Sequence, residues 1–163
     1  MTLLTSLFLG CGYHPSSKEA KKVLGDTVST TVYISITDPE NTVVLKDALD
    51  EAVIRRFQTN LRHKNRAKTH LRIELTSVGF SALQYDSNGY VISYRTTINL
   101  KVIRQTKNFS KSYKAVGNYD FTIDPNAIIT DQQRFEAIAN SATKALDSFV
   151  AQVAAEGTRQ KEN

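Results

Sequence analysis

The sequence predicts an α+β fold, a two-layer sandwich in which two helices cover one face of a four-stranded mixed sheet. Three observations lead to this prediction. Segments with strand and helix periodicity follow in the order β-α-β-β-β-α, a strong turn sequence separates long central strands, and one set of alternating strand positions is polar. With 163 residues, 40% of them hydrophobic and 23% charged, the chain suffices for one domain around one core.

A change of period separates the first strand from the first helix. Residues 28–36 alternate as in a strand, and Asp38-Pro39 then predicts a turn. Over residues 43–64 apolar side chains recur at every fourth position, which predicts an amphipathic helix. These apolar residues are Leu45, Leu49, Val53, Phe57 and Leu61. We expect this helix to form a right-handed crossover between the first strand and the rest of the sheet.

Three long strands are expected to form an antiparallel meander. Asp86-Ser87-Asn88-Gly89 predicts the first hairpin, because Asn-Gly tolerates the positive φ angles of a tight turn. A slip in the alternation at Ser77-Val78 predicts a β-bulge. The second turn is expected within residues 105–108. The strands cover about residues 71–85, 90–103 and 113–123.

A second helix is expected to end the domain. Thr130 and Gln133 have the spacing of a capping box, and an apolar stripe follows them until Gly157, a residue type favoured just after a helix. Pro125 separates this helix from the last strand. These limits define a folded domain over residues 27–157 and a disordered tail over residues 158–163.

The start of the chain indicates export. Residues 1–10 are apolar, and the small residue Gly10 directly precedes Cys11, the only cysteine. This spacing resembles a bacterial lipobox, although Phe8 and Leu9 stand where that pattern usually has leucine and a small residue. We expect residues 1–10 to be the remnant of a cleaved signal peptide, Cys11 to be the lipid attachment site, and residues 11–26 to be a polar tether. The alternative is an unmodified cysteine behind a short hydrophobic tail.

Basic residues concentrate in the middle of the chain, where residues 62–116 contain eleven Lys or Arg and two acidic residues. One candidate phosphate site consists of cations on adjacent strands of the uncovered face: Arg72, Arg95, Lys101 and Lys114. A competing basic cluster precedes the second strand: Arg62, Lys64, Arg66 and Lys68. The alternative to both sites is a solvated surface, because Thr, Ser, Asn and Lys are well hydrated on an exposed sheet face.

Several classes of function have no support in the sequence. The three histidines and the one cysteine do not have the spacing of a metal site, and no nucleophile-elbow or glycine-rich phosphate motif is present. We therefore expect no catalytic residues, no metal and no cofactor. Nucleic acid is also not expected as a partner, because the tyrosines of the sheet are assigned to its core face.

The Cys-Gly-Tyr-His start at Cys11, followed by strand, helix, a meander with a long Asn-Gly hairpin and a C-terminal helix, resembles the LptE family. The likeness spans Cys11 to about Gly157. It implies a non-catalytic lipoprotein, acylated with chains such as palmitate, on the periplasmic side of the Gram-negative outer membrane. It also implies that the protein plugs the LptD barrel during lipopolysaccharide (LPS) transport. Of the family's functional residues, only Cys11 carries over.

The first hairpin is a second candidate contact. Tyr85, Asn88, Gly89 and Tyr90 could insert into a partner, or the aromatic residues could pack across their own hairpin. The alternative function is another outer-membrane lipoprotein, an adaptor that activates a peptidoglycan synthase. Such a role requires a long tether, whereas the expected tether of about 15 residues has a mean reach of roughly 20 Å.

Overall fold

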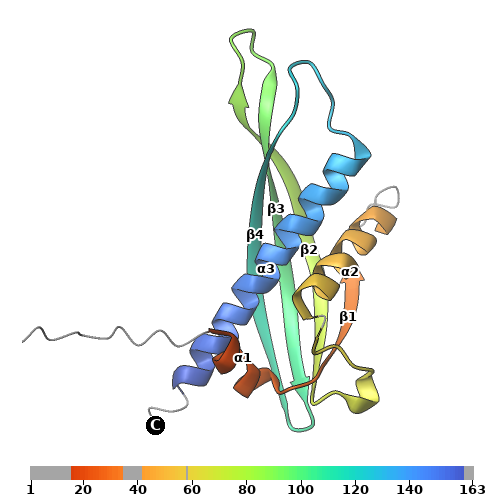
Figure 1. Cartoon of the computed structure of the whole chain (residues 1–163), viewed down its shortest axis with the longest axis vertical. Helices are drawn as coiled ribbons and strands as arrows, with labels where there is room; N and C mark the ends of the chain where they lie inside the picture. Colours follow the sequence, from red (N-terminus) through yellow and green to blue (C-terminus); the bar gives the residue numbers. More distant parts are fainter. Residues whose placement is uncertain (1–15, 35–41, 58, 160–163) are drawn as a thin grey trace, which may run out of the picture.

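The computed structural model describes residues 16–34, 42–57 and 59–159 (Figure 1). Within these residues it contains three α-helices, one 3₁₀ helix and the four predicted strands. The elements are α1 (Ser16–Leu24), β1 (Val28–Ile34), α2 (Thr42–Phe57), η1 (Lys64–Arg66), β2 (Thr69–Tyr85), β3 (Val91–Thr106), β4 (Phe109–Thr122) and α3 (Asp131–Arg159). The predicted order β-α-β-β-β-α is confirmed, and α1 precedes it.

The sheet is mixed, as predicted, with the strand order β1-β2-β3-β4. β1 runs parallel to β2 because α2 carries the chain back between them, and the two hairpins make the other pairs antiparallel. The pairing of β2 with β3 shifts between Leu75 and Ser77. The bulge therefore falls at Thr76, one residue before the predicted position.

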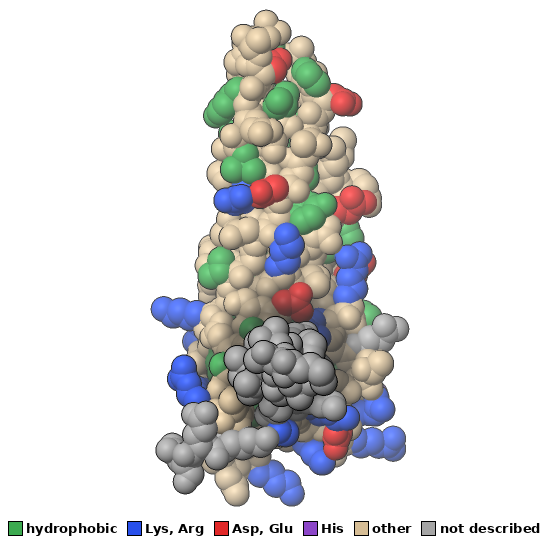
Figure 2. Space-filling view, turned by 60° about the vertical axis from the view of Figure 1, so that its left-hand side comes forward, with side chains coloured by type: hydrophobic (Ala, Val, Ile, Leu, Met, Phe, Trp, Pro, Cys, Tyr) green, Lys and Arg blue, Asp and Glu red, His purple; other side chains and the backbone are tan. Residues whose placement is uncertain are grey.

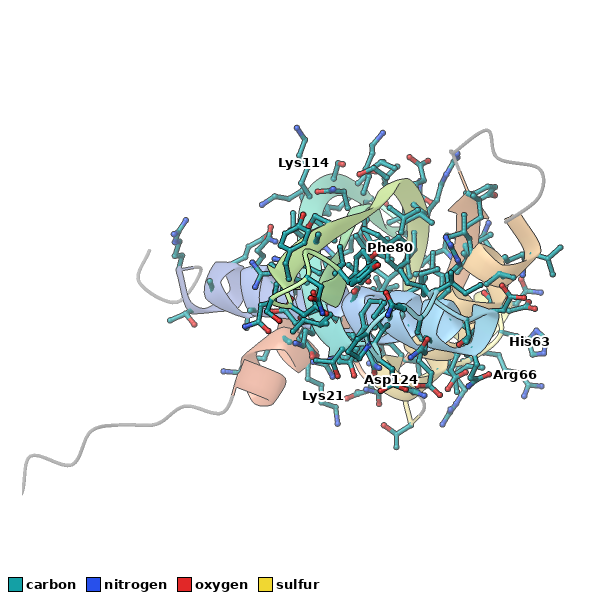
Figure 3. All side chains as sticks on the ribbon, turned by 90° about the horizontal axis from the view of Figure 1, so that it is seen from above. Lys21, His63, Arg66, Phe80, Lys114 and Asp124 are labelled. Carbon is teal, nitrogen blue, oxygen red and sulfur yellow. The ribbon has the colours of Figure 1, made fainter. Side chains whose placement is uncertain are left out.

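All three described helices lie on the same face of the sheet (Figures 1 and 3). The core lies between the two layers, where apolar side chains from β2 and β3 meet those of α2 and α3. Its largest fully buried members include Leu71, Ile73, Leu75, Ile98, Leu100, Leu49, Leu146 and Phe149. Each such side chain contributes about 1.5–3 kcal/mol on burial, so one covered face is enough to stabilise the sheet.

α3 packs closely against β3 and β4. The predicted capping box starts it: the backbone N–H of Gln133 donates to Thr130 Oγ1 at 3.2 Å, and that of Thr130 donates to Gln133 Oε1 at 3.1 Å. The helix presents small residues to the strands, among them Ala142 and Ala145. It continues to Arg159, so the predicted end before Gly157 is wrong: this glycine is buried in the last turn. The predicted disordered tail is wrong for residues 158 and 159.

α2 is shorter than predicted and ends at Phe57 instead of residue 64. The N–H groups of Asn60 and Leu61 both donate to the carbonyl of Phe57, which closes the helix with a turn. Leu61 then forms an isolated parallel bridge with Val28. Leu61, the last apolar residue of the predicted stripe, therefore pairs with β1 at the edge of the sheet and does not extend α2.

The polar tether predicted for residues 11–26 is wrong over α1. Ala20 and Leu24 are buried, and the helix packs against α3. Gly25 ends it with a positive φ of 78° and donates its N–H to the carbonyl of Lys21. The folded domain therefore includes residues 16–26. The signal segment 1–10 and Cys11 lie outside the described residues.

Candidate functional site: two polar surfaces and a hairpin tip

The sheet face opposite the helices is polar and exposed, as predicted; we call it the open face. Alternating residues of all four strands form it, and Figure 3 shows Lys114 pointing away from the helices. Cross-strand pairs hydrogen bond many of its side chains. Thr97 Oγ1 donates to Asn118 Oδ1 at 2.8 Å, and Asn99 Nδ2 donates to Ser77 Oγ at 2.7 Å.

Two of the four predicted phosphate ligands, Arg72 and Lys101, contact one carboxylate on the open face, and a third, Lys114, lies beside Lys101 on β4. Glu74, whose side chain is 12% exposed, contacts Arg72 Nε at 2.7 Å and Lys101 Nζ at 3.6 Å. The guanidinium of Arg72 also lies 4.3 Å from the ring centroid of Tyr33. Lys114 is the register partner of Lys101 and forms no ion pair with another described residue. This group has three cations and one anion, so it retains a positive charge.

Arg95 is not part of that group. It forms a bidentate ion pair with Asp120, its register partner, with both N···O distances at 2.7 Å. These hydrogen bonds raise the pKa of Arg95 and lower that of Asp120. Six residues along β3 separate Arg95 from Lys101, a distance of about 20 Å. The four cations therefore do not converge on one phosphate group.

The competing basic cluster lies in the loop between α2 and β2 and not at a helix end. Arg62 donates to the carbonyl of Leu61 at 2.6 Å. Lys68 forms an ion pair with Asp26 at 3.4 Å, and Lys21 contacts the same carboxylate at 3.2 Å. Hydrogen bonds from both lysines lower the pKa of Asp26. Lys64 and Arg66 extend from η1 into solvent.

A buried polar network joins the two layers, and the sequence did not predict it. Arg104, 5% exposed, contacts Glu156 Oε1 at 3.3 Å and donates to the carbonyl of Val23 in α1 at 3.0 Å. Glu156 Oε2 accepts from Tyr113 at 2.7 Å and Lys111 at 3.0 Å. Burial alone would raise the pKa of Glu156, but these hydrogen bonds outweigh it and lower that pKa. The sequence did contain a signal for this network. Arg104 follows Val102 by two positions, so the alternation of β3 places both side chains on the core face.

The first hairpin extends beyond the helices (Figure 1). The carboxylate of Asp86 accepts from the N–H groups of Asn88 and Tyr90, and Gly89 has a φ of 84°. Tyr85 and Tyr90 are 60% and 49% exposed. Ile128, in the loop before α3 at the same end, is 84% exposed and was not predicted as part of this tip. The sequence signal for this exposed apolar site was the pair Ile128-Ile129 directly before the cap residue Thr130.

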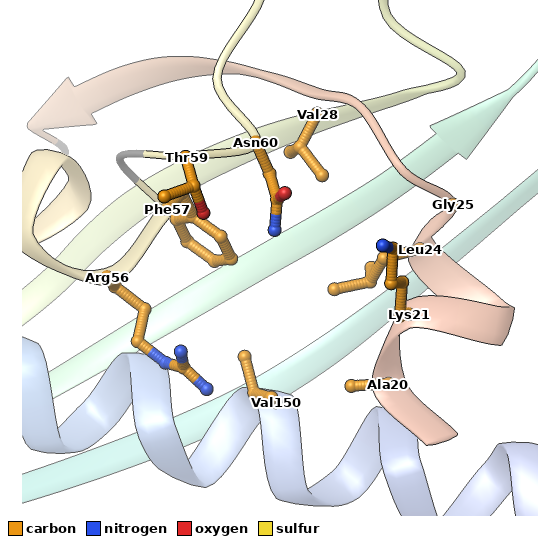
Figure 4. Close-up of a pocket in the computed structure, with 10 residues that line it drawn as sticks. All are labelled: Ala20, Lys21, Leu24, Gly25, Val28, Arg56, Phe57, Thr59, Asn60 and Val150. Carbon is orange, nitrogen blue, oxygen red and sulfur yellow. The ribbon is translucent and has the colours of Figure 1, made fainter. Parts of the chain in front are cut away.

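A pocket of about 300 Å³ lies where α1 meets the end of α2 and the middle of α3 (Figure 4). Leu24, Val28, Phe57 and Val150 line its apolar part, and Lys21 and Arg56 add two cations. Among the described residues that line this pocket there is no acid, histidine or cysteine. Nowhere in the described residues do three or more potential metal ligands cluster. None of the helices in the described ranges is long and apolar enough to cross a bilayer.

Together, the fold and the surfaces define a small α+β domain whose sheet is packed on one face and hydrophilic on the other. The family model for LptE, described as lipopolysaccharide-assembly, matches residues 29–153. The chain belongs to this family, a family of non-enzymatic lipoproteins of LPS assembly, which points to the outer membrane as its location. The resemblance seen in the sequence is thereby confirmed.

Comparison with solved structures finds matches at low sequence identity. The rare lipoprotein B from Shewanella oneidensis is 17% identical, with a TM-score of 0.49 over 83% of this chain and 99% of that chain. A putative lipoprotein from Caulobacter crescentus CB15 is 13% identical, with a TM-score of 0.44 over 89% of this chain and 96% of that chain. No curated protein matches the chain significantly.

Proposed function

We propose that this chain is a lipid-anchored outer-membrane lipoprotein that plugs and supports the LptD barrel during LPS transport, without catalysing a reaction. The observation that carries the proposal is that this chain, a member of the LptE family, leaves one face of its sheet polar and exposed. Large outer-membrane barrels have polar interiors, so a plug must present hydrophilic surface to the wall. The hydrogen-bonded Thr, Asn and Ser side chains of the open face meet this requirement.

The anchor is proposed to be Cys11, on the periplasmic side of the membrane. Four residues separate Cys11 from the first residue of α1. Even fully extended, this stretch spans about 18 Å. The domain is therefore held closer to the membrane than a 15-residue tether would allow. This geometry favours a barrel plug over the alternative function, an adaptor that reaches a peptidoglycan synthase across the periplasm.

The hairpin tip is proposed to insert into the partner. Tyr85 and Tyr90 are exposed on either side of the turn, which Asp86 and Gly89 fix. At the base of the hairpin, the ring of Phe121 stacks on Tyr94 at 5.9 Å, which stiffens the projecting strands. A stiff projection with aromatic side chains loses little conformational entropy when it binds.

The experiment that tests the proposed function is affinity purification of the tagged full-length chain from envelopes, with and without Cys11→Ala. We expect a large β-barrel protein to co-purify with both forms, because the plug contacts the barrel through its own surface and the anchor is secondary. Mass spectrometry identifies the barrel. Absence of any barrel from both preparations would contradict the proposed function.

Direct LPS binding is proposed for the positive group around Glu74, formed by Arg72, Lys101 and Lys114. Replacing both lysines with glutamine is expected to weaken LPS binding about 100-fold or more, since charge-assisted hydrogen bonds contribute about 1.5–3 kcal/mol each. Arg95→Gln is the matched control, because Asp120 already neutralises that cation. Titration of the purified chain with LPS measures the effect. Equal affinity of the double variant and the wild type would remove this proposal.

A further inference from the structure

The two ends of the sheet differ in charge. β2 begins and β3 ends at the same end of the sheet, where His70 pairs with Gln105. This end therefore brings together two acid-free segments, residues 59–69 and residues 104–114. Figure 2 shows basic side chains gathered toward this end, and acidic and hydrophobic side chains toward the hairpin tip. We call the surface formed by Lys21, Lys64, Arg66, Lys68 and Lys107 the basic end.

Within the described residues, the positive charge of the basic end is only partly neutralised. Lys64, Arg66 and Lys107 are exposed, and within the described ranges none of them forms an ion pair. The carboxylate of Asp26 is shared by Lys21 and Lys68. Nearby, the carboxylate of Glu156 already contacts Arg104 and Lys111. Among the residues that the structure describes, the cations at this end therefore outnumber the acids that contact them.

The basic end adjoins the segment that leads to the proposed anchor. Lys68 contacts the segment just after α1. Its backbone N–H donates to Thr27 Oγ1 at 3.1 Å, and its ammonium group contacts Asp26. Figure 1 shows α1, η1 and the turn between β3 and β4 in the same lower part of the molecule. If Cys11 carries the lipid, as the proposed function states, the membrane surface lies within about 18 Å of the start of α1.

We infer that the basic end docks on the phosphate-bearing headgroups of anionic lipids in the leaflet that holds the anchor. A Lys or Arg near an anionic surface attracts it over about one Debye length, which is about 8–10 Å. Lys64 and Arg66 stand on η1, and Lys107 stands on the turn between β3 and β4, so the three cations come from two separate segments. This arrangement fits a surface with many phosphates better than a single phosphate ligand.

Vesicle co-sedimentation of the full-length Cys11→Ala chain tests this inference, because removal of the acyl anchor exposes the weaker contact. We expect binding to vesicles of phosphatidylethanolamine with about a quarter phosphatidylglycerol, and a loss of binding at about 0.5 M salt. The variant Lys64→Gln, Arg66→Gln, Lys107→Gln is expected to lower the partition coefficient about 100-fold, roughly fivefold for each cation. Both proteins retain residues 1–15, so the difference between them reports on the basic end.

The matched control is Lys46→Gln, Arg55→Gln, Lys144→Gln, which removes the same charge from exposed positions on α2 and α3. Its vesicle binding is expected to match that of the parent chain. Equal losses in both triple variants would overturn the inference, since binding would then follow total charge. Complete competition by about millimolar free phosphate would also overturn it, in favour of a single-phosphate site. The inference would also be overturned if the variant Lys64→Gln, Arg66→Gln, Lys107→Gln lost barrel co-purification but kept its vesicle binding, because the basic end would then serve a protein partner.

The vesicle experiment contains no barrel, so it separates the two proposals. Vesicle binding without barrel co-purification contradicts the plug function alone. Barrel co-purification without vesicle binding contradicts the inference alone.

Discussion

Replacing Gly117 with alanine is expected to destabilise the protein by about 3 kcal/mol, at the upper end of the usual cost of overpacking. A Cβ atom at this position would lie 2.0 Å from the carbonyl oxygen of Ser141 and 2.4 Å from the backbone nitrogen of Ala145. Both atoms belong to the backbone of α3, so no side chain can turn aside to make room. The helix would have to move away from β4, and with it the core contacts of Leu146 and Phe149.

Urea unfolding followed by circular dichroism measures this effect. Gly79→Ala is the matched control, since Gly79 lies in β2 and a Cβ there has no neighbour within 4 Å. That substitution is expected to leave stability unchanged or to raise it by about 0.5 kcal/mol, because glycine is unfavourable inside a strand. Equal stabilities of the two variants would mean that α3 does not approach β4 as closely as described.

Replacing Glu156 with glutamine is the second large effect, with an expected loss of about 3 kcal/mol or more. The substitution leaves the guanidinium of Arg104 buried without its carboxylate, and it also removes the anion that accepts from Lys111. Loss of one partner from a buried ion pair is costly because the remaining charge stays out of water. Thermal and urea unfolding report the change.

The double variant Arg104→Met, Glu156→Gln separates the cost of the unpaired charge from the value of the network. We expect it to recover most of the stability lost in the single variant, because both charges are removed and methionine fills the space. Glu136→Gln is the exposed control, expected to change stability by less than about 0.5 kcal/mol. A double variant as unstable as the sum of two single losses would show that the charge of Arg104 is not what makes Glu156 necessary.

Element order, sheet type and the polar character of the open face could be predicted because periodicity reports them directly. α1 could not. Its nine residues carry Ala20, Val23 and Leu24 as their only apolar residues, too few to show a helical stripe. A helix this short is not stable alone and forms because it packs on α3. The missed end of α2 has a similar cause, since Leu61 fits a helical stripe and a sheet edge equally well.

The candidate sites depended on register, which the sequence left open. The two-residue turn at Lys107-Asn108 pairs Thr106 with Phe109 and thereby fixes every later pair, including Arg95 with Asp120. With the turn known only to lie within residues 105–108, neutralisation of Arg95 could not be foreseen. The contact between Arg104 and Glu156 also depends on how far α3 is shifted along its own axis relative to the sheet. Packing of the core determines that shift. Sequence reasoning thus found the cations and missed their partners.

The measurement that tests the central claim most directly is the barrel co-purification of the Cys11→Ala chain, with a photocrosslinking amino acid at Asn118 on the open face. The account predicts that the barrel is retained without the anchor and that Asn118 crosslinks to it, because the hydrophilic sheet lies against the barrel wall. A barrel recovered only with the anchored form, or an open face that crosslinks to no barrel, would contradict the account.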